Sequence, residues 1–268
     1  MSSSGHLYVG TSGFAYSAWR GSLYTLQTRP EEMLSAYAEH FGAVEIDASF
    51  HRFPSEAVLS EWARRTPETF RFSLKVHRAI TYDRKPKDQA RMLSDFVRRC
   101  TALGPRMGVF LLLFPPYRSL DDSFMTQLLQ GLPQGMRAAC LFRHGSWYNQ
   151  GSADLLYRRG LSYCVVDGDY YPAAEVDPKG PFAYLRLQAH DYSQDELAAW
   201  HQRLEPLLAA GKDAYVFFAN PETAPELARR FSDLVVRANH QLGESANVRT
   251  GSPGLSRRAR AEAASPIP

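Results

Sequence analysis

The chain has 268 residues, of which 44% are hydrophobic and 22% are charged, and its net charge is +3. This composition is typical of a soluble globular protein with one large core. The small positive charge does not by itself indicate a nucleic-acid-binding protein. The most apolar run, residues 107–114, is too short to cross a bilayer, so we expect no membrane partner.

The three cysteines argue against a disulfide framework or a zinc site, because their number is odd and no C-x-x-C pair occurs. We expect reduced thiols, with Cys140 and Cys164 packed inside apolar strands. The chain does not open with a basic region followed by an apolar stretch, so no signal peptide is predicted. These features together predict a cytoplasmic protein.

Strand-like and helical patterns alternate along the chain. Strands are predicted at 7–12, 43–47, 70–75, 107–114, 137–144, 161–167, 182–188 and 214–220. Helices are predicted at 30–41, 55–65, 87–103, 121–132, 149–159, 193–210 and 222–242. This alternation indicates right-handed βαβ units and a parallel sheet. Eight strands in this length predict a (β/α)8 TIM barrel, with an open doubly wound sheet as the alternative.

The last part of the chain, residues 243–268, lacks an apolar period and is rich in Ser, Pro, Ala and Arg. We therefore predict one barrel domain over residues 1–242, followed by a disordered basic tail. Arg257, Arg258 and Arg260 in this tail would suit an anionic partner such as nucleic acid, although a solvated tail is the simpler interpretation.

Three predicted strands carry charge on one of their two faces. In residues 43–47, Val44 and Ile46 alternate with Glu45 and Asp47. The strands at 70–75 and 182–188 repeat this pattern and place Lys75 and Arg186 on their polar faces. Burying an unpaired charge costs several kcal/mol or more, by order of magnitude. Recurrent charge in a parallel sheet therefore predicts a polar site.

In a TIM barrel the active site lies at the carboxyl ends of the strands. The sequence places a set of polar and aromatic residues at those ends or in the loops that follow. The expected substrate-binding residues are Thr11, Ser12, Trp19, Arg143, His144, Trp147, Asp167, Arg186 and Asn220, and the expected catalytic residues are Glu45, Asp47, His51 and Lys75.

Each role has a structural alternative. Lys75 could act as a base or Schiff-base nucleophile, but holding an anion is favoured. Guanidinium groups suit carboxylates and phosphates, so Arg143 and Arg186 predict an anionic ligand. Alternatively, these cations only neutralise the nearby acids, and Glu45 forms a structural salt bridge.

A metal site and an aromatic platform are further hypotheses. His51, His77, His144 and Asp47 could bind a divalent metal, but no short ligand motif supports this, so no metal ligand is assigned and the cofactor is left open. The aromatic residues expected in the mouth loops could stack on a sugar or a base, and they are Phe14, Tyr16, Trp19, Trp147 and Tyr192.

Six blocks of the chain, at 10–24, 37–54, 62–81, 142–147, 184–187 and 215–220, resemble the YecE-like domain of unknown function, family seventy-two. The resemblance implies a TIM barrel and implies no assigned activity. This chain retains the family's residues at Glu45, Lys75, Arg143, Trp147, Asp167 and Arg186. The family usually has Asn where this chain has Asp47, Tyr where it has His51, Glu where it has Leu141 and His where it has Gln188. Where the family has Phe-Asn-Asn, this chain has Phe218, Ala219 and Asn220.

Our leading hypothesis is a barrel enzyme that acts on a small anionic substrate, phosphorylated or sugar-like. Lys75, Arg143 and Arg186 would hold the anion while Glu45, Asp47 or His51 transfers protons. A non-catalytic barrel that binds a ligand or nucleic acid is the first alternative. A degenerate pseudoenzyme is the second, and it is suggested by Leu141 and Gln188. The sequence predicts neither the substrate nor the oligomeric state.

Overall fold

The computed structural model describes residues 4–83, 87–168, 180–241 and 248–249. Eight parallel strands form a closed barrel, because β1 pairs with both β8 and β2. They are β1 (Leu7–Ser12), β2 (Ala43–Ile46), β3 (Arg71–Lys75), β4 (Met107–Phe114), β5 (Ala138–Phe142), β6 (Leu161–Asp167), β7 (Ala183–Leu187) and β8 (Ala214–Phe218). The predicted TIM barrel is thus confirmed, and the open doubly wound sheet is excluded.

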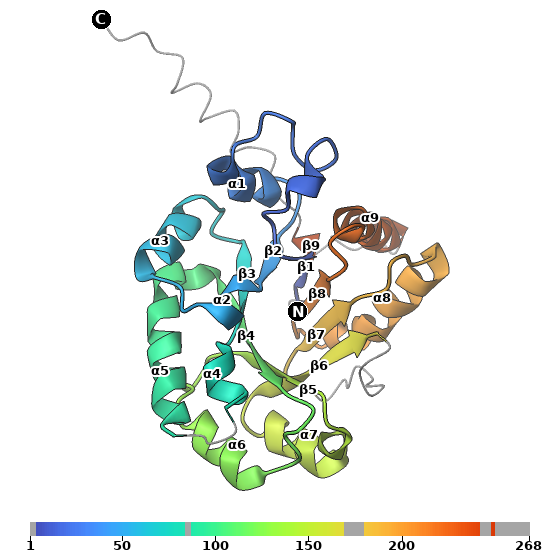
Figure 1. The fold of residues 1–268 in the computed structure, drawn as a ribbon. Coiled ribbons are helices and arrows are strands. Elements are labelled where there is room, and N and C mark those ends of the chain that lie inside the picture. The colour runs from blue at the N-terminus through green and yellow to red at the C-terminus, as the bar shows by residue number, and fades with distance from the viewer. Residues whose placement is uncertain (1–3, 84–86, 169–179, 242–247, 250–268) are drawn as a thin grey trace, which may run out of the picture.

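Helices surround this ring of strands (Figure 1). The longer ones are α1 (Met33–Ala38), α3 (Glu56–Arg64), α5 (Gln89–Cys100), α6 (Asp122–Leu129), α7 (Gln150–Tyr157), α8 (Gln194–Ala209) and α9 (Ala224–Gln241). Each lies within a segment that the sequence predicts to be helical. Several begin at a capping side chain: the Ser193 hydroxyl, for example, accepts a hydrogen bond from the Glu196 amide at the start of α8. No described helix is long and apolar enough to span a membrane.

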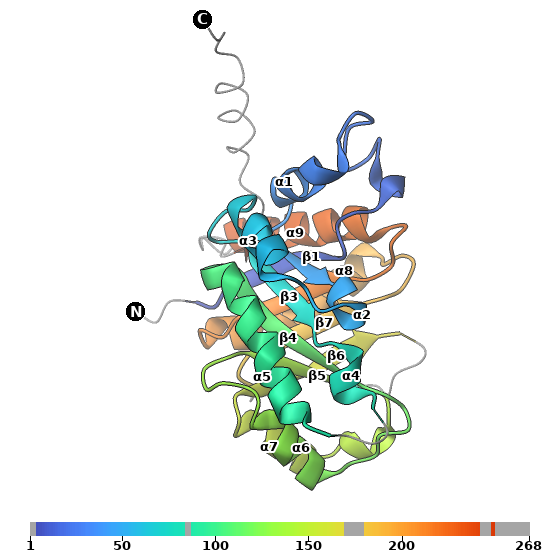
Figure 2. The ribbon, with the colours of Figure 1, turned by 60° about the vertical axis from the view of Figure 1, so that its left-hand side comes forward.

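Two one-turn helices, α2 (Ala48–His51) and α4 (Arg78–Thr81), were not predicted, because a single turn shows no apolar period. They follow directly after β2 and β3 and lie at the same end of the barrel (Figure 2). The Ser49 hydroxyl donates to the backbone oxygens of Ile46 and Lys75, at 2.9 and 2.8 Å. This side chain therefore fixes α2 against the ends of both strands.

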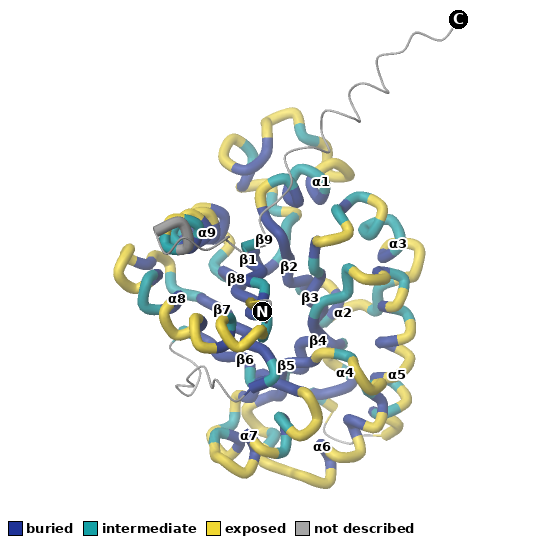
Figure 3. Tube along the Cα trace, turned by 180° about the vertical axis from the view of Figure 1, so that it is seen from behind, coloured by how far each residue is buried: buried dark blue, intermediate teal, exposed yellow. Residues whose placement is uncertain are grey.

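The strands separate two apolar layers. The outer layer joins the helices to outward-facing strand residues such as Val44, Phe72 and Leu185, and the strands are largely buried between the layers (Figure 3). The inner layer fills the barrel with Tyr8, Ala43, Val109, Leu111, Ala139, Leu141, Cys164, Val166, Phe182, Tyr184, Tyr215 and Phe217. The barrel is therefore a packed core, and its inward-facing polar residues stand out against it.

A ninth strand, β9 (Val248–Arg249), pairs in parallel with Leu7 and Tyr8 at the amino end of β1. It lies within the segment expected to be a disordered tail, so these two residues depart from that expectation. The rest of the expected tail, 243–247 and 250–268, lies outside the described residues, as does the connection 169–179 between β6 and β7. Cys100, Cys140 and Cys164 are free and buried, and the core packing predicted for Cys140 and Cys164 is confirmed.

Candidate functional site

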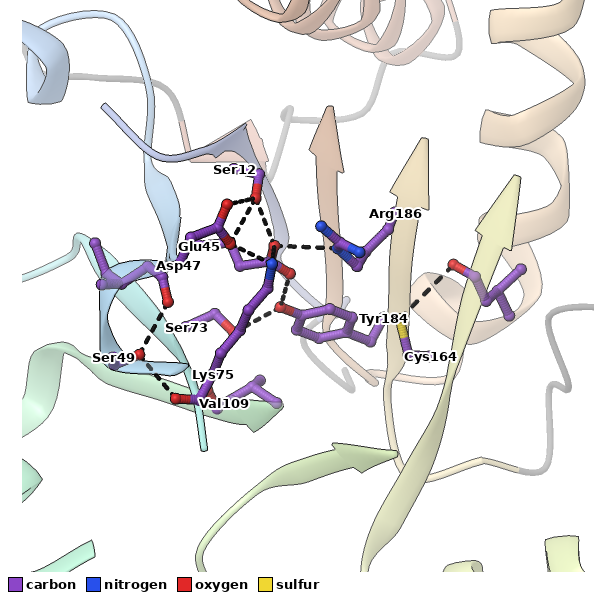
Figure 4. Close-up of polar contacts among 12 residues, drawn as sticks. Ser12, Glu45, Asp47, Ser49, Ser73, Lys75, Val109, Cys164, Tyr184 and Arg186 are labelled. Atoms are coloured by element: carbon purple, nitrogen blue, oxygen red, sulfur yellow. Dashed lines mark hydrogen bonds and ion pairs between the residues drawn. The ribbon is translucent and has the colours of Figure 1, made fainter. Parts of the chain in front are cut away.

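Six inward-facing residues meet at the carboxyl end of the barrel (Figure 4). We call them the mouth cluster, and they are Ser12, Glu45, Asp47, Lys75, Tyr184 and Arg186. The strand register explains part of this arrangement: Ser12 lies beside Glu45, which lies beside Ser73 on β3. Side chains of one face on neighbouring strands are close together, so a polar face on each strand produces one cluster.

Glu45 is the centre of the mouth cluster and is completely buried. Its Oε1 accepts hydrogen bonds from the Ser12 hydroxyl at 2.7 Å and from Nε of Arg186 at 3.0 Å. Nζ of Lys75 lies 3.4 Å from the same oxygen. Oε2 accepts a hydrogen bond from the Tyr184 hydroxyl at 2.7 Å. Each carboxylate oxygen is thus already engaged by the protein.

These contacts keep Glu45 ionised. Burial by itself would raise the pKa of its carboxyl, because a low-dielectric interior disfavours charge. Attraction to Arg186 and Lys75, together with the hydrogen bonds from Ser12 and Tyr184, outweighs burial and lowers the pKa to about 2. Glu45 is therefore suited to holding the two cations in place, and it has no proton to donate near neutral pH.

Asp47 follows β2 and differs from Glu45 in its exposure. Its carboxylate forms an ion pair with Nζ of Lys75, and both of its oxygens lie 3.0 Å from the Ser12 hydroxyl. The Asp47 side chain is 44% exposed, whereas that of Lys75 is 9% exposed. Asp47 is thus the carboxylate of the mouth cluster that solvent or a ligand can reach.

Arg186 presents two unused amino groups. Its Nε is bound to Glu45, but neither Nη1 nor Nη2 has a hydrogen-bond partner within residues 4–83, 87–168, 180–241 and 248–249. Within the described residues, neither Nη group is a buried atom without a partner, so both reach solvent. The Arg186 side chain is only 8% exposed. A guanidinium held through Nε presents its two Nη groups as a fork for a carboxylate or phosphate.

The sequence analysis did not assign Tyr184 or Ser73 to the site, although both lie on the polar strand faces that it identified. The Tyr184 hydroxyl lies 2.6 Å from Oγ of Ser73. The Tyr184 hydroxyl donates to Glu45, and the Ser73 hydroxyl also lies 3.1 Å from the Val109 backbone oxygen, to which it donates. Burial, followed by the nearby charge of Glu45, raises the pKa of Tyr184 well above its usual value. The signal for both was their alternation with Phe72, Leu74 and Leu185.

A glycine shapes the loop that borders the mouth cluster. Gly13 has φ +83°, a value that L side chains rarely adopt, and a Cβ on it would lie 2.7 Å from the ring of Tyr16. The Tyr16 hydroxyl donates to the backbone oxygen of Ser12 at 3.1 Å. Gly13 therefore allows Tyr16 to fold back over the end of β1.

Three expected substrate-binding residues pack in the outer layer. Thr11 is fully buried, with its hydroxyl 2.7 Å from the Gly13 oxygen and 3.0 Å from the Tyr37 hydroxyl. Trp19 is buried and donates to the Pro221 oxygen. Trp147 is completely buried, and its ring stacks on Phe142 with a centroid distance of 4.3 Å. The Thr11 hydroxyl is engaged by the protein, and the two buried indoles have no free face for a ligand. The structure therefore does not place these three residues in the mouth cluster.

The remaining expected residues lie at strand ends around the cluster. Arg143 is exposed after β5, and Asp167 ends β6. Nδ1 of His144 accepts a hydrogen bond from the Ser146 amide at 3.2 Å, and Oδ1 of Asn220 accepts one from the Glu222 amide at 3.1 Å.

The histidines considered as metal ligands also lie outside the mouth cluster. His51 is exposed at the end of α2, and its backbone oxygen lies 3.2 Å from Nε2 of His77. Nδ1 of His77 accepts a hydrogen bond from the Ala79 amide and so caps α4. In the described part of the chain, no three His, Cys, Asp or Glu side chains are close enough to hold a metal ion.

Known proteins share this barrel. Residues 8–251 match the model of a protein family described as "Protein of unknown function DUF72". The chain belongs to this family. Two curated proteins are similar to the chain. The UPF0759 protein YecE of Escherichia coli K12 is 24% identical over 88% of this chain and 95% of its own length. The UPF0759 protein YunF of Bacillus subtilis is 23% identical over 80% of this chain and 88% of its own length.

Solved DUF72 structures have the same fold. The crystal structure of a DUF72 protein from Thermotoga maritima has a TM-score of 0.69 at 23% identity, covering 89% of this chain and all of its own. A DUF72 protein from Enterococcus faecalis has a TM-score of 0.67 at 18% identity, covering 85% of this chain and 94% of its own. These likenesses establish the fold of this DUF72 protein, and its chemistry has to be argued from the mouth cluster.

Proposed function

We propose that this DUF72 protein is an enzyme that binds a small anionic substrate, phosphorylated or sugar-like, at the carboxyl end of its barrel. The supporting observation is the fork of Arg186, whose Nη groups reach solvent while Glu45 fixes the guanidinium through Nε. A guanidinium that is buried and already oriented loses little side-chain entropy on binding a carboxylate or phosphate. Lys75, beside it in the mouth cluster, adds a second cation.

Two carboxylates in unlike environments suit proton transfer. Glu45 is locked as an anion by four neighbours and serves as the positioning residue for Lys75 and Arg186. Asp47 is 44% exposed at the mouth, so it is the carboxylate of the cluster that can reach a proton of the substrate. His51, exposed at the end of α2, is the second candidate for this role. In this proposal Arg143, His144, Asp167 and Asn220 surround the bound substrate.

The test is Arg186→Lys, which keeps the charge and removes the fork. Thermal unfolding of wild type and variant is measured with glycerol 3-phosphate and with malonate, as a phosphate and a carboxylate probe. The proposal expects one of the probes to stabilise wild type and the variant to lose that stabilisation. Arg106→Lys is the matched control, because Arg106 bonds to the carbonyls of Thr66 and Pro67 away from the mouth cluster. Equal stabilisation of all three proteins would refute the proposal.

A structural, non-catalytic cluster is the second candidate, and the charge balance favours it. Two carboxylates, Glu45 and Asp47, face two cations, Lys75 and Arg186, so the mouth cluster has no net charge. If the ion pairs only stabilise the barrel, Arg186→Lys lowers the melting temperature without altering the response to either probe. Arg186→Lys therefore separates the two candidates in one experiment.

The same proposal covers the partners and the compartment of this protein. Nucleic acid is a weaker candidate partner than a small anion, because the fork of Arg186 is nearly buried and fits a single anionic group. A cytoplasmic location is supported by three free cysteines buried in the core.

A further inference from the structure

The amino end of the barrel contains a second concave site, opposite the mouth cluster. A cavity of about 260 Å³ lies where β1, β3, β4 and β8 begin. We call it the base cavity, and the lining residues that matter are Tyr8, Arg71, Gly108, Arg137, Asp213 and Tyr215. Its volume is below the roughly 300 Å³ at which pockets for drug-sized ligands begin, so only a small group fits it.

Arg71 supplies unused donors to this cavity. Its Nη1 donates to the backbone oxygens of Glu68 and Phe70 at 2.9 and 3.0 Å, which fixes the guanidinium. Nε and Nη2 have no hydrogen-bond partner among the described residues, and no described carboxylate forms an ion pair with Arg71. The guanidinium lies 5.4 Å from the ring centroid of Tyr8. A guanidinium that is held in place and has free N–H groups can donate charge-assisted hydrogen bonds to an anion.

Arg137 and two tyrosines complete the donor set. Nη1 of Arg137 pairs with Asp213 and also donates to the Tyr215 hydroxyl at 3.1 Å. Because Tyr215 accepts this bond, its own proton is available to a ligand. Tyr8 stacks on Tyr215 with a centroid distance of 4.9 Å, and its hydroxyl has no partner among the described residues.

The charges of the base cavity favour an anion. Asp213 is the lining carboxylate, and it is already engaged by Arg137 and by the His6 amide at 2.9 Å. Two guanidinium groups against one carboxylate leave a net charge of +1. Gly108 keeps the space open, since a Cβ there would lie 3.3 Å from Cβ of Arg71 and 3.4 Å from the Tyr215 ring.

We propose that the base cavity binds a phosphate group. Its donors are two guanidinium groups and two phenols from four separate segments of the chain, Tyr8, Arg71, Arg137 and Tyr215. This number of donors suits a tetrahedral oxyanion better than a planar carboxylate. The site does not depend on the mouth cluster, since the two share no residue. The ligand is therefore free phosphate or a small phosphate ester.

The experiment is calorimetric titration of the whole chain with inorganic phosphate at low ionic strength, with acetate as the planar comparison. Arg71→Gln is expected to weaken phosphate binding at least tenfold, and Tyr8→Phe about threefold, which provides a second variant should Arg71→Gln fold poorly. Arg64→Gln, an exposed arginine on α3, is the matched control. Arg186→Lys alters the mouth cluster alone. It is therefore expected to leave unchanged the phosphate binding that Arg71→Gln removes, and this distinguishes the two sites. Equal phosphate binding by wild type, Arg71→Gln and Tyr8→Phe would overturn the proposal. It would also be overturned if the site lost in Arg71→Gln bound acetate as tightly as phosphate in the Arg186→Lys protein.

Discussion

Glu45 on β2 and Arg186 on β7 meet inside the barrel, where Nε of Arg186 donates to Oε1 of Glu45 at 3.0 Å. The two residues are 141 positions apart in the chain and lie on strands that do not neighbour each other in the sheet. This contact fixes the guanidinium while leaving its Nη groups unbound, so it links the stability of the barrel to the chemistry proposed for its mouth.

Replacing Glu45 by Gln leaves Arg186 buried without its ion-pair partner, while Lys75 keeps its ion pair with Asp47. Removing one partner of a buried ion pair costs about 3–5 kcal/mol, so we expect a loss of that order in the free energy of unfolding. Chemical denaturation measures it. Glu56→Gln, at an exposed ion pair with Arg98, is the control and should change stability by less than about 1 kcal/mol. Similar losses in the two variants would contradict the role assigned to Glu45.

The stabilisation by Glu45 should depend on pH in a defined direction. Its pKa is lowered in the folded protein to about 2 from an ordinary 4.5. A carboxyl whose pKa is lower in the folded state stabilises the fold above the unfolded pKa, and this stabilisation disappears as the pH falls toward the folded pKa. The difference in unfolding free energy between wild type and Glu45→Gln should therefore shrink as pH is lowered from 4.5 to about 2. A constant difference across this range would show that the carboxyl is not held as an anion.

Replacing Asp47 by Asn should strengthen anion binding at the mouth. The change removes the carboxylate that pairs with Lys75 and raises the net charge of the mouth cluster by one. A unit charge about 4 Å away contributes about 1 kcal/mol in bulk water and more near a protein surface, so we expect roughly fivefold tighter binding at low salt. Proton transfer, where it depends on Asp47, should be lost at the same time. Titration with glycerol 3-phosphate measures the affinity, and weaker binding by the variant would argue against an anionic substrate.

Tyr184→Phe should destabilise the barrel without changing its charge. The variant removes the donor to Oε2 of Glu45 and leaves that buried oxygen without its partner. Hydrogen bonds to charged groups contribute about 1.5–3 kcal/mol, so a loss in this range is expected in denaturant unfolding. Tyr163→Phe, whose hydroxyl donates to the neutral backbone oxygen of Trp147, should cost about 1 kcal/mol. Tyr184→Phe should therefore lose more unfolding free energy than Tyr163→Phe, and the reverse order would contradict the role assigned to Tyr184.

The alternation of side chains along single strands was enough to predict that the central residues of the mouth cluster face inward. It assigned Glu45, Lys75 and Arg186 to inward faces, and the closed barrel brings those faces together. Alternation could not predict which oxygen binds which donor, because those contacts depend on the positions of strands far apart in the chain. It also left Tyr184 unassigned, since a tyrosine on such a face fits an apolar core equally well.

Residues in loops were harder to place from the sequence. Trp147 follows a strand end and so resembles a ligand platform, but its stacking on Phe142 is a contact that local sequence does not reveal. The helices α2 and α4 were missed because each is a single turn, and β9 because it is two residues in a polar segment. In each case the element is fixed by packing against the barrel rather than by its own pattern.

The most direct test of the account is a crystal soaked with selenate, a phosphate-like anion that anomalous diffraction can locate. The account predicts an anomalous peak for a selenate whose oxygens lie within hydrogen-bond distance of both Nη groups of Arg186, and the disappearance of this peak in Arg186→Lys. A mouth cluster with no peak at Arg186, in crystals that bind selenate elsewhere, would contradict the claim that this guanidinium is an anion-binding fork.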